Sequence, residues 1–145
     1  MTQELEKATQ LLETGGYTCV LCRGERVHTS RQRGVQPLLE LLHGNQNLTG
    51  FSAADKVVGK ATAMLYRLLG VRQVYGAVMS EAALQTLKAG NIEAAWGTLV
   101  DHIINRTGDG PCPMEVATAT IQDPAEAYHI IKKTLIRLQG GTQHA

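Results

Sequence analysis

The alternation of predicted strands and helices in the second half of the chain constrains the fold most. A mostly apolar run predicts a strand over Val71–Met79, and Ser80 then caps a predicted helix over Glu81–Lys88. A second strand, rich in branched residues, is predicted over Leu99–Ile104. Strands of one sheet that are joined through a helix run parallel, because the crossover returns the chain to the same edge. The pattern therefore indicates an α/β domain.

The first part of the chain makes the predicted sheet mixed. A helix is predicted over residues 1–16, since leucine and alanine recur there at helical spacing before two glycines. The strands Tyr17–Arg23 and Arg26–Ser30 then form a predicted hairpin. At the other end, the sequence Asp-Pro-Ala-Glu starts a predicted helix over residues 123–139, and residues 140–145 are expected to be a frayed tail.

Length and composition exclude several classes of function. At 145 residues the chain is expected to be one domain, with no linker or internal repeat. A net charge of +1 gives no electrostatic basis for nucleic acid or an anionic membrane as the main partner. Only 4% of the residues are aromatic, so few side chains are available to stack on bases. No apolar run approaches the roughly 20 residues of a membrane-spanning helix, and we expect no membrane partner.

The three cysteines do not form a predicted metal or disulfide site. Cys19 and Cys22 are spaced as C-x-x-C, but residues three apart in a strand point to opposite faces. They therefore cannot bind one metal ion together or form an easy disulfide. An odd number of cysteines without a disulfide framework indicates the reducing cytoplasm as the location.

A basic turn lies between the hairpin and a short predicted helix that Pro37 opens and Gly44 ends. Its charges, Arg31 and Arg33, have two interpretations. They are either solvated surface residues or a clamp for an anion, if this loop faces the functional site.

A long helix is predicted over Ser52–Leu69. Its first four residues have the spacing of a capping box, with Asp55 as the fourth. Gly59 falls early in this helix, where a glycine often permits close approach by a ligand or a neighbouring element. Lys56 and Lys60 are one turn apart, so they form either an exposed pair of solvated charges or part of an anion site.

The segment Asn105–Glu115 is the most reactive part of the sequence. It brings an amide, a guanidinium (Arg106), a thiol and a carboxylate together among glycines and prolines. Pro113 suits the first position of a helix, which makes Cys112 the N-cap and lets Glu115 reach back to the Cys112 N–H. A helix N-terminus favours the thiolate, whereas the nearby carboxylate opposes it. Cys112 is therefore either a reactive thiol or an inert, packed one.

The predicted topology brings these polar segments together. In sheets with parallel strands, ligands bind at the carboxyl ends of the strands, where helix N-termini supply N–H groups. Val71–Met79 ends at Ser80-Glu81, and Leu99–Ile104 ends at Asn105. If both strands run parallel, the two junctions share one edge, and the start of the helix with Asp55 and Lys56 joins them there.

Several of these segments resemble an uncharacterised bacterial and archaeal family with a cytidine-deaminase-like fold. The resemblance covers roughly Tyr17 to Glu115 and implies a three-layer αβα domain with a mixed sheet, which forms homo-oligomers. The matching motifs are Asp55-Lys56-Val57-Val58-Gly59-Lys60-Ala61, Ser80-Glu81-Ala82, Asn105-Arg106 with Cys112-Pro113-Met114-Glu115, and Arg33-Gly34-Val35 with Pro37-Leu38-Leu39.

The zinc-dependent relatives of this family need a His/Cys-x-Glu motif at one helix start and Pro-Cys-x-x-Cys at the next. The corresponding positions here are near Asp55-Lys56-Val57 and Ser80-Glu81-Ala82-Ala83, and they hold no histidine or cysteine. The five histidines are scattered without ligand spacing. We therefore predict no metal site, no other cofactor and no zinc-dependent deamination.

The resemblance implies a nucleotide- or nucleoside-like ligand in the cleft at the helix N-termini. Lysine and arginine would hold an anionic group, and the thiol would act as nucleophile or redox group. The residues predicted to take part in catalysis are Cys112, Lys56 and Asp55, and those predicted to bind the ligand are Lys60, Gly59, Ser80, Glu81, Asn105, Arg106 and Glu115.

Two other functions are considered. The chain is alternatively a non-catalytic binding or regulatory module that kept the scaffold, in which Asp55, Lys56 and Arg106 form a structural ion-pair network. RNA binding is suggested only by relatives that edit nucleic acids, and the near-neutral charge and sparse aromatic residues argue against it.

Overall fold

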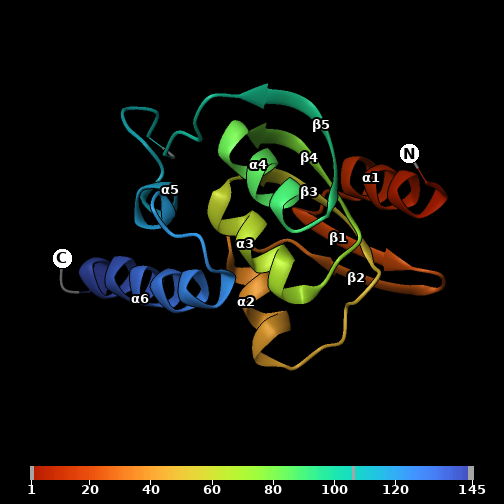
Figure 1. The fold of residues 1–145 in the computed structure, drawn as a ribbon, viewed down its shortest axis with the longest axis horizontal. Coiled ribbons are helices and arrows are strands. Elements are labelled where there is room, and N and C mark those ends of the chain that lie inside the picture. Colours follow the sequence, from red (N-terminus) through yellow and green to blue (C-terminus); the bar gives the residue numbers. More distant parts are fainter. Residues whose placement is uncertain (1, 106, 144–145) are drawn as a thin grey trace.

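The computed structural model describes residues 2–105 and 107–143. A five-stranded sheet lies between helices on both of its faces (Figure 1). The elements in chain order are α1 (Gln3–Gly15), β1 (Cys19–Arg23), β2 (Arg26–Ser30), α2 (Gln36–His43), β3 (Ser52–Val58), α3 (Lys60–Leu69), β4 (Gln73–Ser80), α4 (Glu81–Ala89), β5 (Glu93–Val100), α5 (Pro113–Thr118) and α6 (Pro124–Gln143).

The sheet is mixed, with the strand order β2-β1-β3-β4-β5. The hairpin strands β1 and β2 are antiparallel, and β1 is also antiparallel to β3. The strands β3, β4 and β5 are parallel, connected through α3 and α4. The predicted three-layer α/β architecture with a mixed sheet is confirmed.

Each face of the sheet has its own apolar cluster. On one face, Ala8 and Leu12 of α1 pack on Val20, Cys22 and Ala54. The larger cluster lies on the other face, under α2, α3 and α4, and includes Cys19. The two cysteines of the C-x-x-C sequence therefore point to opposite faces, as the strand geometry predicts.

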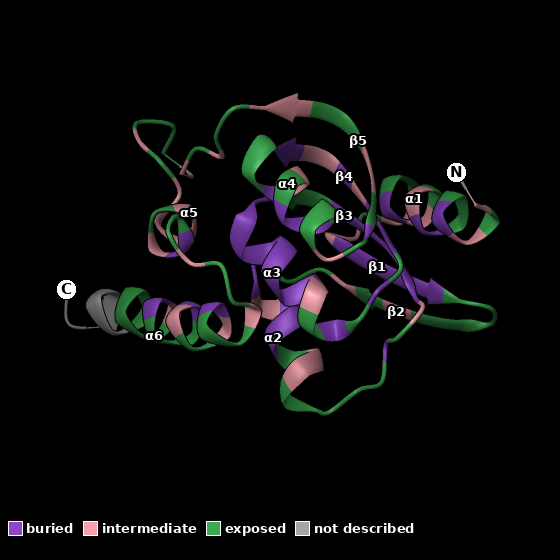
Figure 2. Ribbon diagram, in the orientation of Figure 1, coloured by how far each residue is buried: buried purple, intermediate pink, exposed green. Residues whose placement is uncertain are grey.

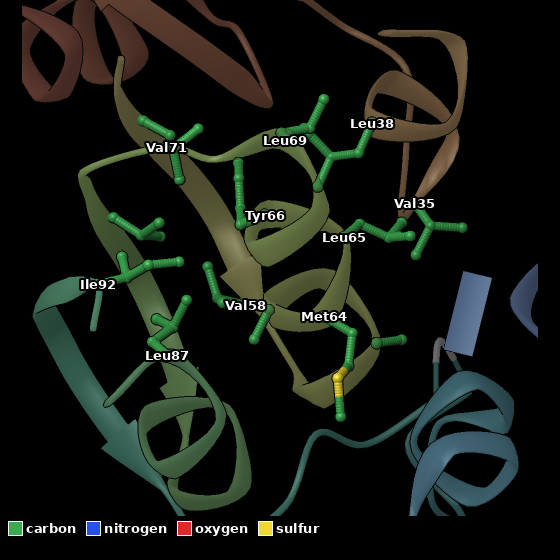
Figure 3. Packing of buried hydrophobic residues seen from close by; sticks show 14 of the residues in the cluster. Val35, Leu38, Val58, Met64, Leu65, Tyr66, Leu69, Val71, Leu87 and Ile92 are labelled. Carbon is green, nitrogen blue, oxygen red and sulfur yellow. The ribbon is translucent and has the colours of Figure 1, made fainter. Parts of the chain in front are cut away.

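Helix α3 is the centre of the larger cluster. Figure 2 shows that buried residues concentrate in α3 and in the inner strands β1, β3 and β4. In Figure 3, Leu65 and Leu69 of α3 point toward Leu38 of α2 and Val35 before it. Tyr66 of the same helix is fully buried, so α3 carries a polar hydroxyl into an otherwise apolar layer.

The predicted long helix over Ser52–Leu69 is wrong in its first half. Residues 52–58 form the inner strand β3, and the helix begins only at Lys60, with Gly59 in an extended conformation as N-cap. Ser52 does not cap a helix, because its hydroxyl donates to Gln73 Oε1 at 3.0 Å. An inner strand that is covered by helices on both faces lacks strict apolar-polar alternation. The capping-box spacing of Ser52 and Asp55 therefore led to the prediction of a helix here, although the spacing is coincidental.

The second predicted strand is also misplaced. The strand β5 comprises Glu93–Val100, paired with β4 from Gln73↔Glu93 to Ser80↔Val100. Residues 101–104 lie beyond it, and Ile104 forms only an isolated bridge with Pro111. The run Ala-Ala-Trp-Gly within β5 is poor in strand formers, so pairing with β4 rather than local propensity makes it a strand.

The terminal helices occur where the sequence predicts them. Gly16, with φ of 70°, ends α1 in the left-handed region that glycine favours. Asp123 caps α6 by accepting from the Glu126 N–H at 3.3 Å. This helix continues to Gln143, beyond the predicted end at residue 139, while residues 144–145 of the predicted tail are outside the described part of the chain. Within that part, no helix is long and apolar enough to cross a membrane.

Candidate functional site

A half-buried carboxylate contact joins the predicted site segments at the carboxyl end of β3. Glu115 of α5 reaches across to the first residue of α3, where its Oε1 accepts from the Lys60 N–H at 2.8 Å. The two residues are 55 positions apart in the sequence. The free N–H groups and the dipole of a helix N-terminus both favour an anion at this place. The carboxylate of Glu115 therefore occupies the anion position of α3.

Gly59 makes this contact possible. A Cβ at residue 59 would lie 1.9 Å from Glu115 Oε1 and 3.3 Å from Ile103 Cγ1. Any side chain would displace the carboxylate, so the absence of one lets α5 approach the backbone of α3. The sequence predicted that Gly59 permits close approach, and the approaching group is a side chain of the same protein.

The Lys60 side chain ties the same two elements together. It is 7% exposed, and its Nζ donates to the backbone oxygen of Ala119 at 2.9 Å. Burial raises the pKa of Glu115, while the Lys60 N–H, the charges of Lys60 and His102, and a hydrogen bond from Ser80 lower it. The net upward direction means that these contacts do not fully replace the lost hydration of the carboxylate.

Ser80 is the third component of this group. It is 1% exposed and caps α4, because its Oγ accepts from the Ala83 N–H at 3.1 Å. Glu81, the next residue, is exposed on the first turn of α4. The structure thus brings Gly59, Lys60, Ser80 and Glu115 together, with Glu81 at the same helix start. We call Lys60, Ser80 and Glu115 the helix-start cluster.

Cys112 has the predicted N-cap position, with Pro113 as the first residue of α5. It is half-buried, and its side chain makes no capping hydrogen bond. The predicted bond from the Cys112 N–H to Glu115 is wrong, since that N–H donates to the Ile103 oxygen at 3.0 Å. The Glu115 carboxylate instead accepts from the first N–H of α3, which lies within reach of α5 in the folded chain.

Asn105 organises its own loop. Its Oδ1 accepts from the N–H groups of Gly108 and Asp109 at 2.9 and 3.2 Å, and its Nδ2 donates to Asp109 Oδ1 at 3.0 Å. This set of bonds gives the amide a local structural role. Arg106, the other predicted polar residue of this loop, lies outside the described residues.

Asp55 and Lys56 are not at a helix start. Both lie in β3, and Asp55 pairs with Cys19 of β1. Lys56 is exposed, and its N–H donates to the Thr18 oxygen at 3.0 Å. Asp55 is buried, and its Oδ2 accepts from the hydroxyl of Tyr66 at 2.7 Å. The predicted ion-pair network at the helix starts is therefore not the environment of Asp55.

Sequence reasoning missed the partners of Asp55. The Tyr66 oxygen also contacts Cys19 Sγ at 3.4 Å, so Asp55, Tyr66 and Cys19 form one buried polar group, the core triad. Burial raises the pKa of Asp55 to about 7, against smaller lowering effects of the bonds from Tyr66 and from the N–H groups of Val57 and Lys56. An aspartate at an inner position of an apolar run was the available signal, but the helix interpretation concealed it.

The described residues contain no group of three or more His, Cys, Asp or Glu side chains placed to hold a metal ion. The basic turn has a local role, because the Arg31 guanidinium donates to the Gly15 oxygen at 2.9 Å and lies 4.3 Å from the centre of the Tyr17 ring.

The fold and these contacts define a three-layer α/β protein whose parallel strands end beside two helix starts. The chain belongs to the family described as a domain of unknown function (DUF1893), whose model matches residues 7–135. The predicted membership of an uncharacterised family is confirmed at this level, and the deaminase-like character and its motifs stay predictions.

Two solved structures from Thermotoga maritima are similar to this chain. A DUF1893 family protein is 23% identical, with a TM-score of 0.84 over 92% of this chain and 90% of that one. A diaminohydroxyphosphoribosylaminopyrimidine deaminase/5-amino-6-(5-phosphoribosylamino)uracil reductase is 12% identical, with a TM-score of 0.44 over 66% of this chain and 35% of that one. A comparison with curated proteins gave no match.

Proposed function

We propose that this chain binds a nucleotide- or nucleoside-like small molecule at the helix-start cluster, without zinc. The anionic group of the ligand takes the place of the Glu115 carboxylate at the Lys60 N–H. One observation carries the proposal: a carboxylate from a distant segment already occupies the N-terminus of α3, at 2.8 Å from a backbone donor. A phosphate suits the same donor, because it combines negative charge with several acceptor oxygens.

The electrostatics of Glu115 support exchange with a ligand. Its pKa is raised mainly by burial, so the carboxylate gains less from the cluster than it loses in hydration. The α3 N–H does not need Glu115 in particular, and any anion of suitable size satisfies it. The buried Lys60 ammonium adds positive charge close to the same position.

A second candidate is a non-catalytic regulatory module in which the cluster is purely structural. The observation that favours it is that the backbone N–H and the ammonium of Lys60 each already have a partner within the chain, Glu115 and Ala119. In this case the contacts fasten α5 to α3, and no ligand replaces them.

Thermal unfolding with a panel of nucleotides and nucleosides separates the two candidates. A ligand at about 100 times its Kd adds about 3 kcal/mol to the free energy of unfolding, which raises the Tm by about 5–10 °C for a domain of this size. The Glu115→Ala variant should bind more tightly than the wild type, since the competing carboxylate is gone. Glu13→Ala, which removes an exposed carboxylate from α1, is the matched control.

Absence of any ligand-induced rise in Tm would contradict ligand binding. If no compound of the panel stabilises either the wild type or Glu115→Ala, the structural interpretation of the cluster holds. We expect EDTA to leave the ligand-induced rise in Tm unchanged, because the proposed site uses no zinc.

If the protein is also an enzyme, we propose Cys112 as its reactive thiol. Cys112 is half-buried, whereas Cys19 and Cys22 are buried, so a small alkylating reagent should label Cys112 selectively. We expect labelling faster than in the unfolded chain, and protection when a stabilising nucleotide is bound. Labelling no faster than in urea would remove the nucleophile from the proposal and leave the binding function.

We propose a cytoplasmic location from the cysteine content and self-association from the family resemblance. Light scattering coupled to size-exclusion chromatography tests the second point directly. A monomer across the working concentration range would contradict it.

A further inference from the structure

A cavity of about 430 Å³ opens between the β1–β2 hairpin and α2, and we call it the hairpin cavity. Its volume falls within the range of small-molecule sites in proteins. Neither Lys60, Ser80 nor Glu115 lines it, so it is distinct from the helix-start cluster.

The lining of the hairpin cavity changes from apolar to polar outward. Cys19, Leu21 and Pro37 form a buried floor. His28 and Leu41 are half-buried, and the His28 ring lies 5.8 Å from the Phe51 ring at an interplanar angle of 50°. A buried apolar floor with a ring in the wall suits the flat face of a heterocycle.

The rim of the cavity carries no single dominant charge. Gln32, Glu40 and Gln46 are exposed there, together with Arg31. The guanidinium of Arg31 already donates to the Gly15 oxygen and stacks on Tyr17. Amide side chains pair with the combined donor and acceptor edge of a base or lactam. The rim therefore suits an uncharged polar edge better than a phosphate.

The floor of the cavity is connected to the core triad. Cys19 lines the cavity, and its sulfur contacts Tyr66, which donates to Asp55. Burial raises the pKa of all three groups, so the sulfur stays a neutral thiol that a ligand ring can cover. A buried aspartate bonded to a tyrosine beside a cavity floor is more typical of a functional site than of a simple core.

We propose that the hairpin cavity binds an uncharged planar heterocycle of nucleobase or nucleoside size, with its ring on the Cys19 floor and its polar edge at the rim. This site goes beyond the function proposed above, since it needs no anionic group and none of the helix-start residues.

Amide chemical shifts of the ¹⁵N-labelled full chain test the proposal, with uracil, cytosine, adenine and their nucleosides as probes. The shifts should cluster in β1, β2 and α2. Leu41→Trp, which fills the half-buried wall, should abolish them, whereas Gln85→Trp on the exposed face of α4 should not. Glu115→Ala should leave binding of the uncharged probes unchanged.

Three results would overturn the proposal: no saturable shifts at millimolar probe, shifts confined to the helix-start cluster, or undiminished binding by folded Leu41→Trp. If Leu41→Trp does not fold, the shift map of the wild type decides alone. Phosphate-dependent binding that Glu115→Ala strengthens concerns the other site, so failure of one proposal is distinguishable from failure of the other.

Discussion

Replacing Asp55 by asparagine should make the protein more stable at alkaline pH and remove much of the pH dependence of its stability. The carboxylate is buried, and its pKa in the folded protein is raised from 3.8 to about 7. For an acid whose folded pKa is raised, the folded state binds the proton more tightly than the unfolded one. Its stabilising contribution is therefore complete below the unfolded pKa and is lost as the pH rises through 7.

The size of the effect follows from the shift. A difference between 3.8 and about 7 corresponds to about 4 kcal/mol of unfolding free energy between low and high pH. About 2 kcal/mol of this change falls between roughly pH 5.5 and 8, where the folded group titrates while the unfolded one is already ionised. Asparagine keeps an acceptor for the Tyr66 hydroxyl and carries no charge, so it avoids this loss.

Urea unfolding of the wild type and Asp55→Asn at a series of pH values measures the difference. Because asparagine stands in for the protonated side chain, the two proteins should have similar stability below about pH 4. The variant should be more stable by about 2 kcal/mol near pH 5.5 and by about 4 kcal/mol at pH 8. Comparing the two chains cancels the contribution of the groups they share, including Glu115, whose pKa is also raised. A difference between them that is independent of pH would refute the assigned cause, because it would show that Asp55 does not titrate in this range.

Three further substitutions test the helix-start cluster, the core triad and the Asn105 loop. Gly59→Ala should cost about 1–3 kcal/mol through loss of the Glu115 bond, and most of this cost should vanish in a Glu115→Ala background, as a double-mutant cycle in urea would show. Tyr66→Phe removes the hydroxyl that donates to Asp55, so it should lower the free energy of unfolding more at pH 8, where the carboxylate is charged, than at pH 5.5. An equal loss of stability at the two pH values would contradict this role of Tyr66. Asn105→Ala should increase amide exchange at residues 107–110 with little change in Tm, and unchanged exchange would exclude its loop-ordering role.

Local sequence chemistry predicted the elements whose ends are marked by strong signals. Gly16 after α1, Ser80 before α4 and the Asp123-Pro124 start of α6 each specify a boundary through backbone geometry or a capping bond. Such signals involve only a few neighbouring residues. The helix boundaries that they specify therefore do not depend on contacts with distant parts of the chain.

The failures share a physical cause. Residues 52–58 form a strand because they sit between β1 and β4, and no local property of the segment outweighs that environment. The same applies to β5, where pairing with β4 overrides weak strand propensity. Glu115 was predicted to bond within its own segment, whereas its partner is 55 residues away. The spacing of residues within one segment cannot predict a partner so far away in the sequence.

Helix α3 connects the two polar groups that the sequence could not pair. Its first N–H binds the carboxylate of Glu115, and its Tyr66 binds that of Asp55. Burial raises the pKa of both acids, so each makes the folded protein less stable at neutral pH than a neutral residue of the same shape would. Local departures of this kind from the rules of a stable core are expected at functional sites. Because the two acids bind the same ten-residue helix, one at its first residue and the other at Tyr66, α3 links the helix-start cluster to the core triad.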